Sequence, residues 1–175
     1  MVAVAANSAE ASFAATFVRE YSAVVGVAYR VLGDRADAED VAQDLFAGYL
    51  GGRRLPSPGA LRLAAAHRAL NLLRSRRRRV ARELADYRLC PAVARDAGQS
   101  DEPFAALDRA ARQTLVRAAL LRLRPRDAQL LALRYGGASY RDVALTLYID
   151  ESQVGTRLAR AERAFRTEIE RAATS

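Results

Sequence analysis

Apolar residues recur at helical spacing along most of the chain. In the first part they lie three or four residues apart, as Phe13, Phe17, Tyr21, Val24, Ala28 and Leu32. This spacing places them on one face of a helix. Gly33 follows in the position that a helix C-terminus favours. The pattern predicts a first long helix that ends at Leu32.

Two more helices are predicted before residue 85. Asp34 is suited to cap a second helix, which has apolar residues on one side and acidic residues on another. Ser57 and Pro58 have the character of an N-cap and a first-turn proline, and they predict a third helix that reaches about residue 84 and becomes strongly basic in its second half. Three helices would then form the first domain.

The periodicity fails between residues 86 and 103, where Pro, Gly, Gln and Ser accumulate. We therefore predict a flexible linker there. It would separate a first domain over 1–85 from a second over 104–175. The expected fold class is all-α, with two small helical domains.

The second domain is predicted to end in a helix-turn-helix. Ser139 and Asp142 have the spacing of a capping box, and Asp150 and Gln153 repeat it at the start of the last helix. The tight turn 148–150 joins the two helices. In such a unit the second helix buries one stripe and offers its other side to the DNA major groove.

Composition supports a helical protein that meets an anionic partner. The 175 residues are 51% hydrophobic, with no Trp and only five Pro, and the formal net charge is +8 with every basic residue an Arg. Arginine suits phosphates and base edges, although solubility alone also accounts for net charge.

The sequence gives little indication of metal binding, redox chemistry or nucleophilic catalysis. A single Cys90 and a single His67 offer neither an internal disulfide nor a metal site, and no phosphate loop or nucleophile motif is present. We expect no catalytic residues, no metal and no cofactor, and so not an enzyme. With no apparent signal peptide or membrane-inserting segment, we expect a cytoplasmic protein.

Three polar faces are candidates for binding. The last helix offers Ser152, Gln153, Thr156, Arg157 and Arg160 opposite its apolar stripe, and the third carries the cluster Arg74, Arg76, Arg77, Arg78, Arg79 and Arg82. Both suit DNA. The second helix has the opposite charge, with Asp37, Glu39, Asp40 and Asp44, which suggests a protein partner. A solvated surface is the alternative in each case.

In this order, these segments resemble the extracytoplasmic-function sigma factors of bacterial RNA polymerase, over about 13–170. The resemblance rests on the stretches YRVLGD at 29–34, AEDVAQDLF at 38–46, AAHRALNLLR at 65–74, LRPRDAQLLALRY at 123–135, SYRDVA at 139–144 and VGTRLARA at 154–161. It implies a subunit that binds core polymerase and directs promoter-specific initiation.

The resemblance also implies roles for individual residues. Core polymerase would be bound, at the clamp helices of its largest subunit, by Asp37, Asp40, Gln43, Asp44 and Phe46. The minus-ten element would be read by His67, Asn71, Arg74, Arg76, Arg77 and Arg78. The minus-thirty-five element would be read by Ser152, Gln153, Thr156, Arg157 and Arg160. The expected partners are core polymerase, including its beta flap, promoter DNA and an anti-sigma factor.

Five positions depart from the family pattern. Ala60 stands where members usually have Trp, His67 where they have Asn, and Asn71 where they have Asp, which predicts altered capture of unstacked bases. Tyr148 replaces a turn Gly, and Gly155 replaces a basic residue, which predicts modest minus-thirty-five affinity. A stand-alone helix-turn-helix regulator and an adaptor that binds only protein remain alternatives.

Overall fold

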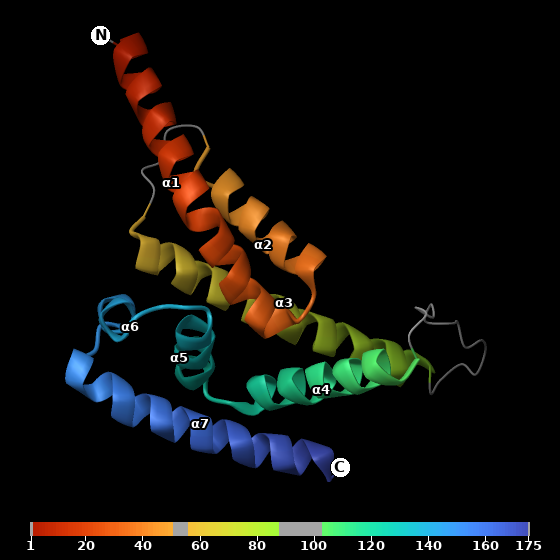
Figure 1. Ribbon diagram of the computed structural model, residues 1–175. Helices are drawn as coiled ribbons and strands as arrows, with labels where there is room; N and C mark the ends of the chain where they lie inside the picture. Colours follow the sequence, from red (N-terminus) through yellow and green to blue (C-terminus); the bar gives the residue numbers. More distant parts are fainter. Residues whose placement is uncertain (1, 51–55, 88–102, 175) are drawn as a thin grey trace.

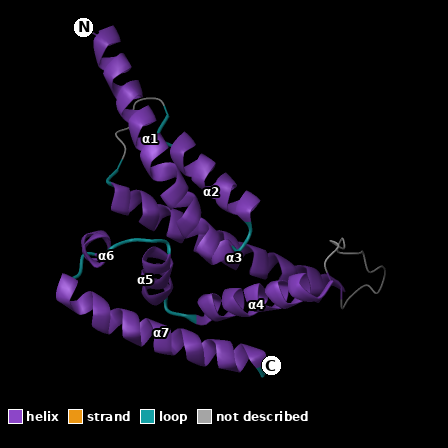
Figure 2. Cartoon of the chain, in the orientation of Figure 1, coloured by secondary structure: helices purple, strands orange, loops and turns teal. Residues whose placement is uncertain are grey.

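The computed structural model describes residues 2–50, 56–87 and 103–174, and within them the chain is helical, with no strand (Figures 1 and 2). The helices are α1 (Val2–Leu32), α2 (Arg35–Ala47), α3 (Pro58–Tyr87), α4 (Pro103–Arg122), α5 (Pro125–Tyr135), α6 (Tyr140–Leu147) and α7 (Glu151–Ala173). The all-α prediction is confirmed. Most of the predicted linker lies outside the described residues.

Helices α1, α2 and α3 pack on one another and form the N-terminal half. Gly33, at φ +67, ends α1, and its backbone N–H donates to the Tyr29 carbonyl at 2.7 Å. A left-handed backbone of this kind favours glycine. Within the predicted apolar stripe of α1, Val24, Ala28 and Leu32 are buried, at 0%, 0% and 2% exposure, whereas Phe13, Phe17 and Tyr21 are partly buried against the core. The helix itself begins eleven residues before Phe13, at Val2, in a segment rich in Ala, the best helix former.

Helices α4 to α7 form the C-terminal half. Pro125 opens α5 in a position where its missing N–H costs no hydrogen bond. The predicted capping box at the start of α6 is confirmed, because Ser139 accepts from the Asp142 N–H at 3.1 Å and the Asp142 carboxylate accepts from the Ser139 N–H at 3.2 Å. Tyr148 then ends α6.

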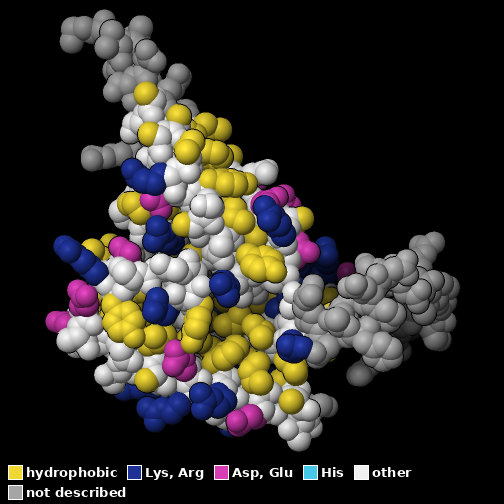
Figure 3. Space-filling view, viewed as in Figure 1, with side chains coloured by type: hydrophobic (Ala, Val, Ile, Leu, Met, Phe, Trp, Pro, Cys, Tyr) yellow, Lys and Arg dark blue, Asp and Glu magenta, His cyan; other side chains and the backbone are white. Residues whose placement is uncertain are grey.

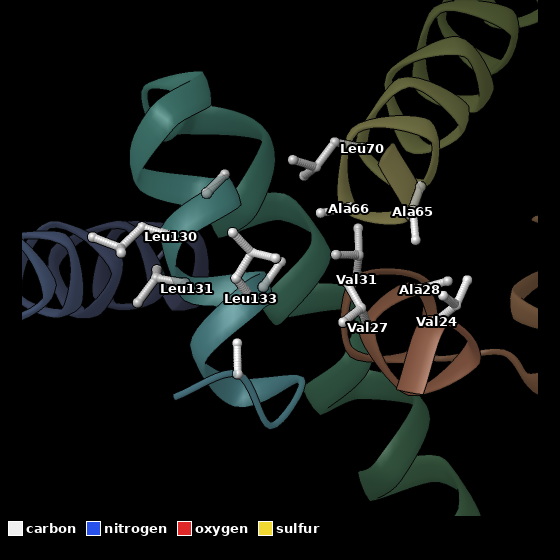
Figure 4. Packing of buried hydrophobic residues seen from close by; sticks show 14 of the residues in the cluster. Val24, Val27, Ala28, Val31, Ala65, Ala66, Leu70, Leu130, Leu131 and Leu133 are labelled. Atoms are coloured by element: carbon white, nitrogen blue, oxygen red, sulfur yellow. The ribbon is translucent and has the colours of Figure 1, made fainter. Parts of the chain in front are cut away.

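The two halves share one hydrophobic core. Figure 1 shows α3 lying between the α1–α2 pair and helices α4 to α6. In Figure 4, Leu133 of α5 lies toward Val27 and Val31 of α1 and toward Ala66 of α3, and all four belong to a single buried cluster. The hydrophobic periodicity did not predict this packing between the halves.

Among the described helices, none has the length and apolarity that a membrane span needs.

Candidate nucleic-acid and protein interfaces

The exposed side of α2 carries acidic residues at helical spacing. Asp34 caps the helix, since its carboxylate accepts from the Asp37 backbone N–H at 2.9 Å. The cap fixes where α2 begins, and so which side each later residue occupies. Asp40, Gln43 and Asp44 are exposed and lie three and four residues apart, on one side of the helix. These three residues form the acidic face of α2.

Asp37 is separate from this face, because its carboxylate is held within the molecule. The Arg76 guanidinium on α3 donates to it through both terminal nitrogens, with Nη2 at 2.6 Å from Oδ1. This hydrogen-bonded ion pair lowers the pKa of the Asp37 carboxyl below its usual 3.8. Two residues predicted to meet different partners therefore neutralise each other in this structure.

Phe46, predicted to contact polymerase, is buried. Its exposure is 2%, and its ring lies 5.0 Å from that of Phe17, 6.1 Å from that of Tyr21 and 6.3 Å from that of Phe13. A side chain with almost no exposed surface offers little to a partner in this arrangement, and a direct contact between Phe46 and polymerase stays a prediction. Phe46 packs α2 against α1. In this way it also holds the acidic face of α2 in place.

A ladder of polar side chains runs along α3. His67 and Asn71 are exposed, with the Asn71 amide nitrogen 3.4 Å from the His67 ring nitrogens, and Arg74 Nη1 donates to Asn71 Oδ1 at 3.2 Å. Spacings of four and three place the three residues on one helix face. The opposite side of the helix buries Ala65, Ala69 and others in the core. This ladder is the polar face of α3.

Two of the arginines that follow the ladder, Arg78 and Arg79, have short-range partners. Arg77 and Arg78 are exposed, and Arg78 Nη2 donates to Ser75 Oγ at 3.3 Å. Arg79 forms an ion pair at 3.7 Å with Glu83, one turn further along. Exposed pairs of this kind are worth well under about 1 kcal/mol, so a phosphate backbone can displace them at little cost.

In the C-terminal half, α6 and α7 form the predicted helix-turn-helix. Val154, Leu158 and Ala161 hold α7 against the core. The five residues predicted to read DNA are all exposed: Ser152, Gln153, Thr156, Arg157 and Arg160. Arg157 Nη2 donates to Gln153 Oε1 at 2.9 Å, so these two side chains lie together one turn apart. The five residues form the outer face of α7.

The second predicted capping box does not form. The Asp150 carboxylate accepts from the Ser152 backbone N–H at 2.8 Å and from the Ser152 hydroxyl at 2.5 Å. Gln153, the expected reciprocal partner, accepts from Arg157 instead. A charged donor makes a stronger hydrogen bond than a neutral backbone N–H, and this accounts for the different partner. Asp150 still caps α7.

A hollow of about 650 Å³ adjoins the outer face of α7 and reveals residues that sequence reasoning missed. Its lining includes Arg157 and Arg160, and also Arg124 and Arg126 at the start of α5. Tyr148, exposed by 94%, stands at its edge. The two extra arginines are distant in sequence from α7, so only the fold brings them together. Four arginines around one concave surface suit a phosphate backbone.

Nothing in the described part of the chain resembles a metal centre, since no three His, Cys, Asp or Glu side chains gather there in a way that could hold an ion. The exposed acidic, polar and basic faces of α2, α3 and α7 suit binding to other macromolecules.

Comparison with family models accounts for both halves. The model described as sigma-70 region 2 matches residues 16–83, and the one described as sigma-70 region 4 matches residues 113–165. The chain belongs to the sigma-70 family. It is a sigma factor of the extracytoplasmic-function type, as its motifs predicted. The residues assigned to this sigma factor's binding faces all lie within the two matched ranges.

One solved structure similar to this sigma factor is that of the sigma factor RpoE from Bartonella quintana, in a co-crystal with the anti-sigma factor NepR. It is 18% identical and aligns with a TM-score of 0.50 over 91% of this chain and 97% of that chain. At this identity the match shows the fold alone. The comparison with curated proteins gives no significant match.

Proposed function

We propose that this sigma factor binds core RNA polymerase through the acidic face of α2, at the clamp helices of the largest subunit. The observation that carries the proposal is this exposed negative face on a chain whose net charge is +8. A negative surface disfavours DNA and favours a protein partner. Phe46 supports the face from beneath, and Asp37 is engaged by Arg76.

We further propose that two separate faces read the promoter. The polar face of α3, with Arg77 and Arg78 beyond it, would meet the minus-ten element, and the outer face of α7 the minus-thirty-five element. Base edges are read by side chains such as Gln and Arg near the N-terminus of a recognition helix. The C-terminal half would also contact the beta flap of polymerase. This work takes place in the cytoplasm, where polymerase transcribes.

Single charge reversals test the polymerase surface. Asp44→Arg is expected to weaken co-elution with core polymerase on size exclusion at least about tenfold, because a like charge against a complementary surface costs several kcal/mol. Glu170→Arg, an equal reversal at an exposed site on α7, is the matched control. Equal binding by both variants, with unchanged helical content, would exclude α2 as the docking surface.

An anti-sigma factor is a proposed further partner, supported by the likeness to a sigma factor solved with one. An apolar groove of about 470 Å³ between α1, α4, α5 and α7 offers a surface for it, lined by Leu120, Leu131, Phe165 and Ile169 among others. Figure 3 shows hydrophobic side chains gathered on this face. Contiguous exposed apolar surface of this kind marks protein-interaction sites.

The groove is tested by comparing activity inside and outside the cell. Ile169→Glu is expected to leave transcription by reconstituted holoenzyme unchanged while it raises a reporter's activity in cells, because an antagonist no longer binds. Thermal melts of the variant control for folding. A reporter that stays at its wild-type level would argue against this groove as the antagonist's site.

A further inference from the structure

The turn of the helix-turn-helix contains a residue in an uncommon backbone conformation. Tyr148 has φ 54 and ψ 51, and among the described residues it is the one residue other than glycine with a positive φ. This left-handed conformation is unfavourable for a residue with a Cβ. The Tyr148 side chain is 94% exposed, so packing within the molecule does not offset the strain. Strain that the fold itself does not offset is typical of functional sites.

Tyr148 lies beside arginines that have few partners. It lines the hollow of about 650 Å³ next to α7, together with Arg124, Arg126, Arg157 and Arg160. Within the described part of the chain, only Arg157 among these arginines has a hydrogen-bond partner, which is Gln153. One carboxylate, that of Asp127, also lines the hollow, so positive charge predominates there. A bound anion would relieve the repulsion between the guanidinium groups.

The place of Tyr148 in the fold puts it next to a DNA backbone. The turn joins α6 to α7, and in Figure 1 it lies at the edge of the molecule. In a helix-turn-helix the second helix enters the major groove by its N-terminal residues, and the first helix crosses the sugar-phosphate backbone. Gln153, the third residue of α7, follows Tyr148 by five positions. If α7 reads base edges, the turn faces the backbone at the edge of the groove.

We infer that Tyr148 is a DNA-contact residue, whose phenol hydroxyl donates to a phosphate at the edge of the minus-thirty-five element, while Arg124 and Arg126 meet neighbouring phosphates. The inference rests on the proposed function, since it takes α7 as the helix that reads this element. Tyrosine hydroxyls are among the donors that proteins use for phosphate oxygens, and such contacts fix the register of the protein on the duplex without reading its sequence. Tyr148 therefore strengthens promoter binding at a cost in stability.

Promoter binding by holoenzyme, reconstituted from core polymerase and the full-length chain, tests the contact. One duplex fragment supports transcription by the wild-type holoenzyme, and a second differs from it only in a replaced upstream element. Tyr148→Phe keeps the ring and the backbone conformation but removes the hydroxyl. It is expected to weaken binding to the first fragment by about threefold to tenfold and to leave binding to the second unchanged. Tyr29→Phe, the same change at an exposed tyrosine of α1, is the matched control.

Stability and binding should change in opposite directions in Tyr148→Gly. This variant relieves the backbone, so the melting temperature of the free chain should rise by about 2–4 °C. Promoter binding should weaken at least as much as in Tyr148→Phe. A Tyr148 without a DNA contact predicts instead a more stable variant that binds the promoter as well as the wild type.

A different phosphate-binding side chain should restore the contact. Tyr148→Arg is expected to bind the first fragment at least as tightly as the wild type. Its binding should also depend more steeply on salt, by about one unit of the logarithmic slope, because one more phosphate is neutralised.

Uncharged methylphosphonate linkages, introduced one at a time along the upstream element, identify the phosphate. At one position the substitution should weaken binding by the wild-type holoenzyme severalfold and binding by Tyr148→Phe much less. Such non-additivity is expected of two groups in contact.

Two results would overturn the inference while reading by α7 stands. One is equal promoter binding by the wild type, Tyr148→Phe and Tyr148→Gly. The other is a loss that appears in the affinity for core polymerase and not in the affinity for the promoter, which would assign Tyr148 to a polymerase contact. Wild-type holoenzyme that binds both fragments equally would instead refute the proposed reading of the upstream element, and the inference with it.

Discussion

Replacing Phe46 separates a supporting role from a direct contact. Its ring packs against three aromatic rings of α1 at centroid distances of 5.0 to 6.3 Å, and only 2% of its surface is exposed. Its neighbours Asp44 and Gln43 are exposed on the acidic face. If Phe46 only holds α2 in place, its removal lowers stability, and core binding falls only through unfolding.

The magnitude follows from the packing. Truncating a buried Phe to Ala costs about 3–5 kcal/mol, and each aromatic pair adds about 0.5–1.5 kcal/mol beyond area burial. With three ring partners, Phe46→Ala belongs at the upper end of the first range. A domain of this size is stable by about 5–15 kcal/mol, so the variant loses a third or more. Phe46→Leu keeps most of the apolar contact and is expected to cost about 1–2 kcal/mol.

Urea denaturation followed by circular dichroism measures both costs. Core binding is then measured at a temperature where Phe46→Leu is fully folded, and we expect the wild-type affinity. Phe46→Ala should bind weakly and recover when an osmolyte restores folding. Loss of core binding by a fully folded Phe46→Leu would refute this reasoning, because the ring would then contact polymerase itself.

Three further predictions concern single side chains. Tyr148→Gly should stabilise the protein by about 1 kcal/mol in thermal melts, since Tyr148 has φ 54 in a backbone conformation that favours glycine and its ring is almost fully exposed. Arg157→Ala should relax preference at one position of the upstream element by about 1–3 kcal/mol, whereas Arg160→Ala should weaken all sequences alike and make the salt dependence shallower. Asp37 has a folded pKa below its usual 3.8, so its ion pair contributes stability at neutral pH that is lost on acidification below about pH 4. In Asp37→Asn, the free energy of unfolding should therefore depend less steeply on pH in this acidic range.

Local signals predicted where several helices begin or end. Asp34 and Ser139 each cap a helix by a hydrogen bond three residues away, and Gly33 and Pro125 act on the backbone beside them. Helix caps and helix ends depend on residues that are close together in the sequence. Periodicity and capping patterns are therefore sufficient to find them. The helix-turn-helix was predicted for the same reason.

Contacts distant in sequence were not predictable from these patterns. The Asp37–Arg76 ion pair joins residues 39 apart, and the approach of Gly59 to Thr146 joins the two halves. Nothing local distinguishes Gly59 from a glycine with open space around it, such as Gly26. The burial of Phe46 had a local signal, because Ala38 and Ala42 precede it at four-residue spacing and all three are buried.

Transcription in a reconstituted system tests the central claim most directly. Core polymerase is given a library of promoter fragments with and without the full-length chain, and transcripts are mapped by their start sites. The account predicts that the chain starts transcription on a subset of fragments that share two separated sequence elements, and that Asp44→Arg strongly reduces this transcription. The account would be contradicted by two results together: core polymerase starts no transcript when the chain is added, and the free chain by itself binds duplex DNA tightly and specifically.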